Sequence, residues 1–126
     1  MYQLISNLYK VQSFKKIDFI FGLIMYIIIN NKHYNIIMPV VYVLLLKNSK
    51  RYVGYTNNYK KRMEKHFSGK GSQVTRKYPP VKVERIIPCY NKAYGLTVEN
   101  TITQQLMQKH GVNMVRGGSW TNSNTF

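Results

Sequence analysis

Acidic residues are scarce in this chain of 126 residues, and their scarcity limits the chemistry that it can carry out. Against 19 lysines and arginines stand four acids: Asp18, Glu64, Glu84 and Glu99. A hydrolytic site with two metal ions needs several converging carboxylates, which this chain can hardly supply. A single Mg²⁺ is compatible with the composition, because Mg²⁺ keeps most of its waters and takes only one or two protein carboxylates.

Cysteine and histidine are also scarce. Cys89 is alone in the sequence, so neither an intrachain disulfide nor a cysteine-based zinc site can form. The three histidines, at positions 33, 66 and 110, are scattered along the chain, which argues against a zinc site made of histidines. A chain with this cysteine usage is typical of the inside of a cell.

Positive charge, in contrast, is abundant. The formal net charge is +15 and the isoelectric point is about 10.0. Such an excess is typical of proteins with a polyanionic partner, because contacts with phosphates release counterions and dominate affinity. A basic surface that only maintains solubility is the plainer alternative. An anionic membrane surface is a second candidate partner for the positive charge. Nucleic acid is the partner that the composition favours.

Residues 1–38 differ in composition from the rest of the chain and are rich in Ile, Asn, Tyr, Lys and Phe. The apolar stretch from Phe19 to Ile29 is shorter than the roughly 20 residues that span a bilayer, so membrane association through 19–29 is disfavoured without being excluded. Asp18 and the lack of a small-residue cleavage site argue against a signal peptide. We predict that residues 1–38 form an N-terminal extension, and three interpretations of it stay open. It is an added helix, an anchor at a membrane surface, or a segment that is not translated because the true start is Met38. Residues 39–126 then form the folded domain.

From residue 40 onward the hydrophobic pattern predicts strands and helices in turn. The predicted elements are a buried strand over 40–46, a turn over 47–50, a strand over 51–55, a helix capped by Asn57 or Asn58 and running to about Phe67, a loop over 68–72, a strand over 81–89, and a helix capped by Asn91, running to Lys109 and ended by Gly111. Residues 113–126 are expected to be irregular. This order predicts an α+β fold in which a small antiparallel three-stranded sheet is flanked by helices.

The spacing of apolar residues also predicts which face of each helix is buried. In the first helix the predicted core residues are Tyr59, Met63 and Phe67, and in the second they are Gly95, Val98, Ile102 and Leu106.

Two side chains of the first predicted helix suit a phosphate group. Arg62 and His66 are one turn apart, so they project from one face. A guanidinium and an imidazole presented together match a phosphoryl oxygen that develops negative charge. A solvated basic face is the plainer interpretation, because Lys60, Lys61 and Lys65 surround the two residues, and spacing alone favours it.

Glu99 and two tyrosines are further candidates. Glu99 adjoins the apolar stripe of the second helix, so its carboxylate should be paired, protonated or metal-bound; a salt bridge fits the composition equally well. Tyr42 and Tyr52 lie in the two hairpin strands, but with 11 tyrosines in the chain any one is ordinarily a packing residue. Gly54 is compatible with a bulge or with a close approach of another group.

In their joint order these residues resemble the GIY-YIG nuclease family. Val40-Val41-Tyr42 stands in place of the first signature, Gly-Ile-Tyr, and Tyr52-Val53-Gly54 in place of the second. The resemblance extends to Arg62, to His66, to Glu99 in the late helix, and to Asn113, where some members carry an asparagine. It covers Val40 to about Asn113.

The tail from Val115 to Trp120, which contains Arg116, resembles an ending seen in GIY-YIG proteins of large DNA viruses. The core is also similar to the nuclease domain of members that cut branched DNA. The zinc-binding domain of those members, and the DNA-binding extensions of homing endonucleases, have no counterpart here.

The resemblance implies a metal-dependent endonuclease that hydrolyses phosphodiester bonds of DNA, with branched or repair intermediates as the expected substrates. Glu99 would hold one divalent metal, Mg²⁺ with Mn²⁺ as a substitute. Tyr42 would take the proton of the attacking water, Arg62 would stabilise charge on the phosphoryl group, Tyr52 would position water or phosphate, and His66 would assist proton transfer or bind phosphate. Gly54, Asn113 and Arg116 are additional candidates.

DNA is the expected partner, with a second protein supplying specificity. The residues expected to follow its backbone are Lys60, Lys61, Lys65, Lys70, Arg76 and Lys77. The expected location is intracellular, in the cytoplasm or nucleus of a host cell if the chain is viral. The alternative from a different class is a non-catalytic nucleic-acid-binding module on the same fold.

Overall fold

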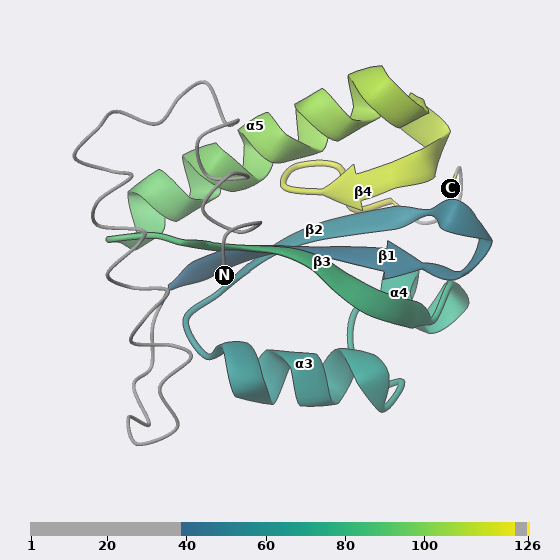
Figure 1. The fold of residues 1–126 in the computed structure, drawn as a ribbon, viewed down its shortest axis with the longest axis horizontal. Helices are drawn as coiled ribbons and strands as arrows, with labels where there is room; N and C mark the ends of the chain where they lie inside the picture. The colour runs from purple at the N-terminus through teal and green to yellow at the C-terminus, as the bar shows by residue number, and fades with distance from the viewer. Residues whose placement is uncertain (1–38, 123–125) are drawn as a thin grey trace.

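The computed structural model describes residues 39–122 together with Phe126, and within them a four-stranded sheet has helices on both faces (Figure 1). The proposed extension over 1–38 and its apolar stretch lie outside the described residues. Among the described helices, none combines the length and the apolar character needed to cross a membrane. The elements are, in order, β1 (Val40–Leu46), η1 (Lys47–Ser49), β2 (Arg51–Thr56), α3 (Tyr59–Phe67), α4 (Gln73–Lys77), β3 (Pro80–Pro88), α5 (Lys92–His110), η2 (Val112–Met114) and β4 (Val115–Gly117).

Strand β1 lies inside the sheet, whose order is β3-β1-β2-β4. It pairs antiparallel with both β2 and β3. Val41 and Val43 pack with α5, whereas Tyr42 and Leu44 pack with α3 and α4 on the opposite face. Because both faces of β1 are covered, its sequence is an uninterrupted apolar run rather than an alternating one, as predicted.

The hairpin between β1 and β2 sets which side chains share a face. Asn48 and Ser49 in its turn adopt left-handed backbone angles, with φ of 63° and 60°, and the amide of Leu46 donates to the carbonyl of Lys50. The resulting register places Tyr42 opposite Gly54. Tyr52 is two residues before Gly54 on β2, so both tyrosines point to the α3 side.

Helix α3 follows the predicted stripe at Tyr59, which is partly buried, and at Met63, but not at Phe67. Asn58 caps it by accepting from the amide of Lys61, and Met63 is buried, as predicted. Phe67, however, is 50% exposed, whereas His66 is 1% exposed. A helix has about 3.6 residues per turn, so a strict spacing of four drifts off the buried face, and position 66 returns to it better than position 67.

Helix α4 is an element that the sequence pattern did not reveal. Ser72 caps it by accepting from the amide of Thr75, and Val74 is buried against the core. Arg76 and Lys77 therefore lie on a helix. Five residues are too few to show a helical period in the sequence.

The second difference is β4, which pairs parallel with β2 and makes the sheet mixed. The α+β class and the flanking helices are confirmed, but the sheet has four strands instead of three, and part of the tail expected to be irregular is a strand. Arg116 holds this tail: its Nε donates to the carbonyl of Asn122 at 2.6 Å, and its Nη1 donates to those of Val112 and Val115, each at 2.7 Å. Its guanidinium also lies 4.9 Å from the ring centre of Phe126.

We expect Arg116→Ala to lower the free energy of unfolding by about 2–4 kcal/mol, because three carbonyls, one of them in a buried hydrogen bond, lose a charged donor. Arg116→Lys should recover only part of this, since a single ammonium cannot reproduce the guanidinium fork. Urea denaturation measures both, with Arg76→Ala on the exposed face of α4 as the control. Equal midpoints for Arg116→Ala and Arg76→Ala would contradict this role.

Candidate active site

Tyr42 and Tyr52 are brought together on the α3 face of the hairpin. Tyr42 is 1% exposed, and the two rings are tilted with their centres 6.3 Å apart. The phenol of Tyr42 lies directly over Gly54, so a Cβ at position 54 would overlap its Cζ and Oη. Of the two expectations for Gly54, close approach is the one that the structure shows, and glycine there is a steric requirement of the buried tyrosine.

His66 is the third member of what we call the tyrosine–histidine cluster (Tyr42, Tyr52 and His66). Its Nε2 lies 2.7 Å from the hydroxyl of Tyr42, and its ring contacts both tyrosine rings edge-on, with centres 5.5 and 5.4 Å away. The side chain is therefore separate from the solvated basic face that its spacing suggested. Helix α3 positions it there because its buried stripe includes position 66.

Thr75 and Ser72 connect the cluster to α4, and sequence reasoning missed both. The Nδ1 of His66 lies 3.0 Å from the Thr75 hydroxyl, which in turn donates to the Ser72 carbonyl at 3.2 Å. A carbonyl only accepts, so this bond uses the one proton of the Thr75 hydroxyl. The Thr75 oxygen then accepts from Nδ1–H, and Nε2 is left to accept from Tyr42. Ser72 is also hydrogen-bonded to Tyr52.

A sequence signal for these two residues did exist. Ser72 stands three residues before Thr75, the spacing of a helix cap and its recipient amide, directly after a glycine-containing loop. Gly71 in this loop abuts His66 and Thr75 so closely that a Cβ would overlap the His66 Nδ1.

Burial dominates the electrostatics of the cluster. It raises the pKa of Tyr42 far above the ordinary value for tyrosine, reinforced by Tyr52 and Glu99 and opposed by Arg62. Burial also lowers the pKa of His66 to about 4, with the positive charge of Arg62 adding to the effect. At neutral pH the imidazole is thus neutral and the phenol protonated, as the hydrogen bond between them requires.

Glu99 reaches the same region from the other side of the sheet. Strand β4 pairs with β2 only along Arg51–Val53, so the edge at Gly54 and Tyr55 is open. The half-buried Glu99 on α5 accepts from the amide of Tyr55 there; burial raises its pKa and that amide opposes the rise. Its charge acts on both tyrosines of the cluster.

Arg62 is exposed on α3, one turn before His66, and its charge acts on all three members of the cluster. The residues expected to follow a DNA backbone are exposed on the same side, on α3, on the loop after it and on α4: Lys60, Lys61, Lys65, Lys70, Arg76 and Lys77. A polyanion approaching this side therefore meets Arg62 and a basic surface next to the buried cluster.

Two additional candidates have other partners in the described structure. The carbonyl of Asn113 accepts from the Nζ of Lys50 at 2.9 Å, and Asn113 lines a separate cavity of about 290 Å³ with Arg116 and Trp120. Arg116 lies opposite Tyr52 in the sheet, but its guanidinium is bonded to carbonyls of the tail.

The neutral state of His66 should make folding pH-dependent. Unfolded His66 takes up a proton near its ordinary pKa of 6.5, whereas the folded imidazole does so only at about pH 4. Between these values the unfolded state binds more protons, so stability falls as pH falls, by at most about 3 kcal/mol. Urea denaturation from pH 7 to pH 4 should show this loss for the native chain and a smaller one for His66→Gln. An equal loss of stability in the native chain and in His66→Gln would contradict this role of His66.

Thr75→Val should remove the group that fixes the imidazole tautomer while keeping the shape of the side chain. We expect the ring nitrogen chemical shifts of His66 to move from the Nδ1–H form toward a mixture with the Nε2–H form. Thr101→Val, on the outer face of α5, is the matched control and should leave these shifts unchanged. Identical His66 shifts in Thr75→Val and the native chain would show that Thr75 does not set the tautomer.

Comparisons with known proteins identify relatives of this chain. UPF0213 protein FN1575 of Fusobacterium nucleatum is 30% identical over 69 residues, 55% of this chain and 69% of that protein. UPF0213 protein OB0043 of Oceanobacillus iheyensis is 36% identical over 64 residues, 51% of this chain and 74% of that protein. UPF0213 protein BLi00048/BL00536 of Bacillus licheniformis is 43% identical over 53 residues, 42% of this chain and 48% of that protein. These relatives are bacterial, and the viral setting expected from the tail stays a prediction.

No solved structure matches the chain. The family model described as the GIY-YIG catalytic domain matches residues 38–113, a range that contains β1 to α5, the tyrosine–histidine cluster, Arg62 and Glu99. The chain therefore belongs to the GIY-YIG catalytic domain family, whose fold is that of a nuclease.

Proposed function

We propose that this chain is a metal-dependent endonuclease that hydrolyses phosphodiester bonds of DNA. The observation that carries the proposal is the buried 2.7 Å hydrogen bond between Tyr42 and His66, with Arg62 and Glu99 close enough to act on the same phenol. A proton donor, a neutral imidazole, a guanidinium and a carboxylate in one place are the groups that hydrolysis of a phosphodiester needs. GIY-YIG domains are typical of endonucleases, which supports the proposal.

The residues present fit one Mg²⁺, with Mn²⁺ as a substitute. Within the described residues no group of three or more His, Cys, Asp or Glu could hold a metal. Glu99 supplies one hard oxygen ligand, and its raised pKa means that a nearby cation would stabilise its charged form. When bound, the metal would neutralise phosphate charge and make the nearby Tyr42 more acidic.

The proton path follows from the hydrogen-bond pattern. Tyr42 takes the proton of the attacking water after giving its own to Nε2 of His66. In the free protein the proton stays on Tyr42, because burial raises the pKa of the phenol and lowers that of the imidazole. An anionic phosphate beside His66 favours its protonated form, so proton transfer is coupled to the presence of substrate.

The remaining residues bind and orient the substrate. Arg62 is exposed at the cluster and holds the phosphoryl oxygens, for which its planar fork is suited. Tyr52, fixed by Ser72, orients water or phosphate. The basic side chains of α3, α4 and the loop between them follow the DNA backbone without reading its sequence. Branched DNA and repair intermediates are the substrates we propose, with a partner protein adding specificity.

Glu99→Gln tests this function most directly. The amide keeps the size of the side chain and an acceptor for Tyr55 but loses the negative charge that a cation needs. We expect cleavage of linear, flapped or four-way DNA in Mg²⁺ or Mn²⁺ to fall at least about a hundredfold while DNA affinity stays nearly unchanged. Glu64→Gln, on the exposed side of α3, is the control and should keep the native rate.

Two outcomes would contradict parts of this proposal. Native-like cutting by purified Glu99→Gln would contradict the role of Glu99 as the metal ligand. Tight DNA binding by the native chain with no cutting of any substrate in either metal would identify the alternative, a non-catalytic nucleic-acid-binding module on the same fold.

A further inference from the structure

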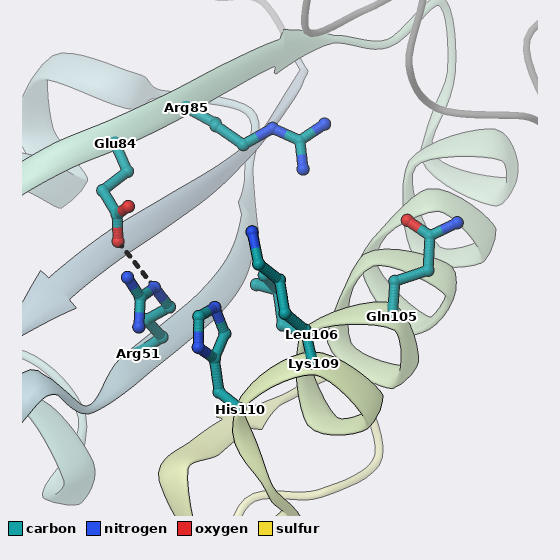
Figure 2. A pocket seen from close by; sticks show the side chains of 7 residues that line it. All are labelled: Arg51, Glu84, Arg85, Gln105, Leu106, Lys109 and His110. Carbon is teal, nitrogen blue, oxygen red and sulfur yellow. Dashed lines mark hydrogen bonds and ion pairs between the residues drawn. The ribbon is translucent and has the colours of Figure 1, made fainter.

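Two cavities of the described structure differ in the chemistry of their walls. The one between β3 and the last turns of α5 is lined mainly by charged side chains (Figure 2). A bulge in β3 leaves Glu84 without a residue opposite it in β1, and the Oε1 of Glu84 accepts from the Nε of Arg51 at 2.8 Å, so an ion pair already lies along that wall. The other cavity lies at the tail and includes Trp120 in its lining.

The lining of this tail cavity combines one large aromatic ring with uncharged polar side chains. Arg116 is its one charged residue, and the guanidinium is engaged with three backbone carbonyls. The amides of two asparagines and the hydroxyls of Ser119 and Thr121 can each donate and accept a hydrogen bond. The cavity therefore suits a neutral, planar, polar ligand better than an anion. Its lining residues are Val112, Asn113, Arg116, Ser119, Trp120, Thr121 and Asn122.

The backbone around Trp120 is fixed by contacts within the tail and with α5. The amide of Gly117 donates to the carbonyl of Trp120 at 2.7 Å, and the amide of Trp120 donates back to the carbonyl of Gly117 at 2.8 Å. Between them Gly118 adopts a φ of 55°, and a Cβ there would overlap the side-chain oxygen of Asn100. The amide of Ser119 donates to that same oxygen at 3.1 Å. The indole is therefore presented from a well-anchored turn.

An indole that is anchored in this way and 37% exposed is a suitable surface for stacking. Aromatic side chains stack on nucleobases, whose faces are also planar π systems. The edges of a base carry donors and acceptors, which amide side chains match in pairs. Cavities for small molecules measure roughly 300–1,000 Å³, so the tail cavity, at about 290 Å³, suits a single base.

We infer that the tail cavity binds one unpaired nucleobase, with Trp120 stacking on its face and Asn113 contacting its edge. The formal net charge of +15 attracts nucleic acids, which supply such bases. In a duplex each base face is covered by its neighbours, so only an unpaired or extruded base reaches the indole. An unpaired stretch of a strand and a free nucleoside both present the same chemistry.

The site adjoins the part of α5 that carries the proposed metal ligand, because the turn before Trp120 contacts Asn100, which follows Glu99. The inference nevertheless does not require the proposed hydrolysis, since stacking needs neither a metal nor the tyrosine–histidine cluster. Glu99→Gln should lose cleavage and keep base binding. A native chain that cuts DNA but binds no base at Trp120 would contradict this inference alone.

The first experiment follows the fluorescence of Trp120 in the native chain without divalent metal. The chain has one tryptophan, so the emission reports on this residue alone. A single-stranded oligonucleotide should quench it through base stacking. A strand of the same length made of abasic sites has the same phosphates and should bind through the basic surface without this quenching. Equal quenching by the two strands would overturn the site, because the signal would then come from phosphate contacts.

Two small molecules distinguish the sources of the base. Quenching by adenosine but not by ribose would show that a free nucleoside fills the cavity, and quenching by the oligonucleotide alone would identify a strand as the source. Both outcomes support the site. Failure of adenosine and the oligonucleotide alike to quench Trp120, or equal quenching by adenosine and ribose, would reject the inference.

Substitutions at Trp120 test whether its ring holds the base. Trp120→Ala should weaken affinity for the single-stranded oligonucleotide about tenfold and leave affinity for the abasic strand unchanged. Trp120→Phe keeps a smaller ring, disturbs the tail less, and should show a partial loss of the same kind. Leu96→Ala removes an exposed apolar side chain of α5 outside the cavity and should change neither affinity. Native affinity in both Trp120 variants, or an equal loss for the two strands, would contradict stacking.

Discussion

The hydrogen bond between Tyr42 and His66 is the interaction on which the arrangement of this domain depends. It joins the central strand β1 to α3 across a buried layer, and it needs space on both sides. Gly54 provides that space under the phenol, and Gly71 provides it beside the imidazole. Packing thus explains the glycine of the second signature, Gly54. A methyl group at this position would displace Tyr42 from its hydrogen bond with His66.

The length of β4 matters as much as the packing. Had this strand continued along β2 past Val53, its backbone would have taken the free edge at Gly54 and Tyr55. Because β4 ends at Gly117, the carboxylate of Glu99 reaches that edge and acts on the two tyrosines from the far side of the sheet. The short strand therefore places a residue of the α5 layer beside a cluster of the α3 layer.

The sequence predicted the parts of this structure that repeat a pattern over many residues. Strand β1 and helix α5 lie within one or two residues of their expected bounds, because an apolar run and a capped 19-residue helix carry strong periodic signals. Helix α4 and strand β4 are five and three residues long, too short for any period. The bulge at Glu84 was also invisible, because a bulge depends on the pairing of two strands far apart in sequence.

The residues of the candidate site also fall into two groups, those proposed from the sequence and those seen only in the structure. Tyr42, Tyr52, Arg62, His66 and Glu99 were proposed through their joint order, and spacing alone favoured a solvated surface for two of them. Ser72 and Thr75 were not found, because their importance comes from the position of α4 beside α3, which no local pattern encodes. Residues that orient another side chain are in general harder to find than the side chain they orient, since their only signal is a short polar motif.

The scarcity of acids, seen first in the sequence, acquires a structural meaning. Of the three acids in the described residues, Glu84 is paired with Arg51, Glu64 is exposed on α3, and Glu99 lies at the edge near the cluster. The negative charge acting on the tyrosines is therefore concentrated in Glu99, within a domain whose charge is strongly positive. Glu99 adds to the burial that keeps Tyr42 protonated, whereas burial and the charge of Arg62 keep His66 neutral. In this resting state the phenol cannot act as a base. In the proposed mechanism the phosphate and the cation that arrive with the substrate reverse both preferences, so the same burial that stabilises the fold also keeps the site inactive until DNA is bound.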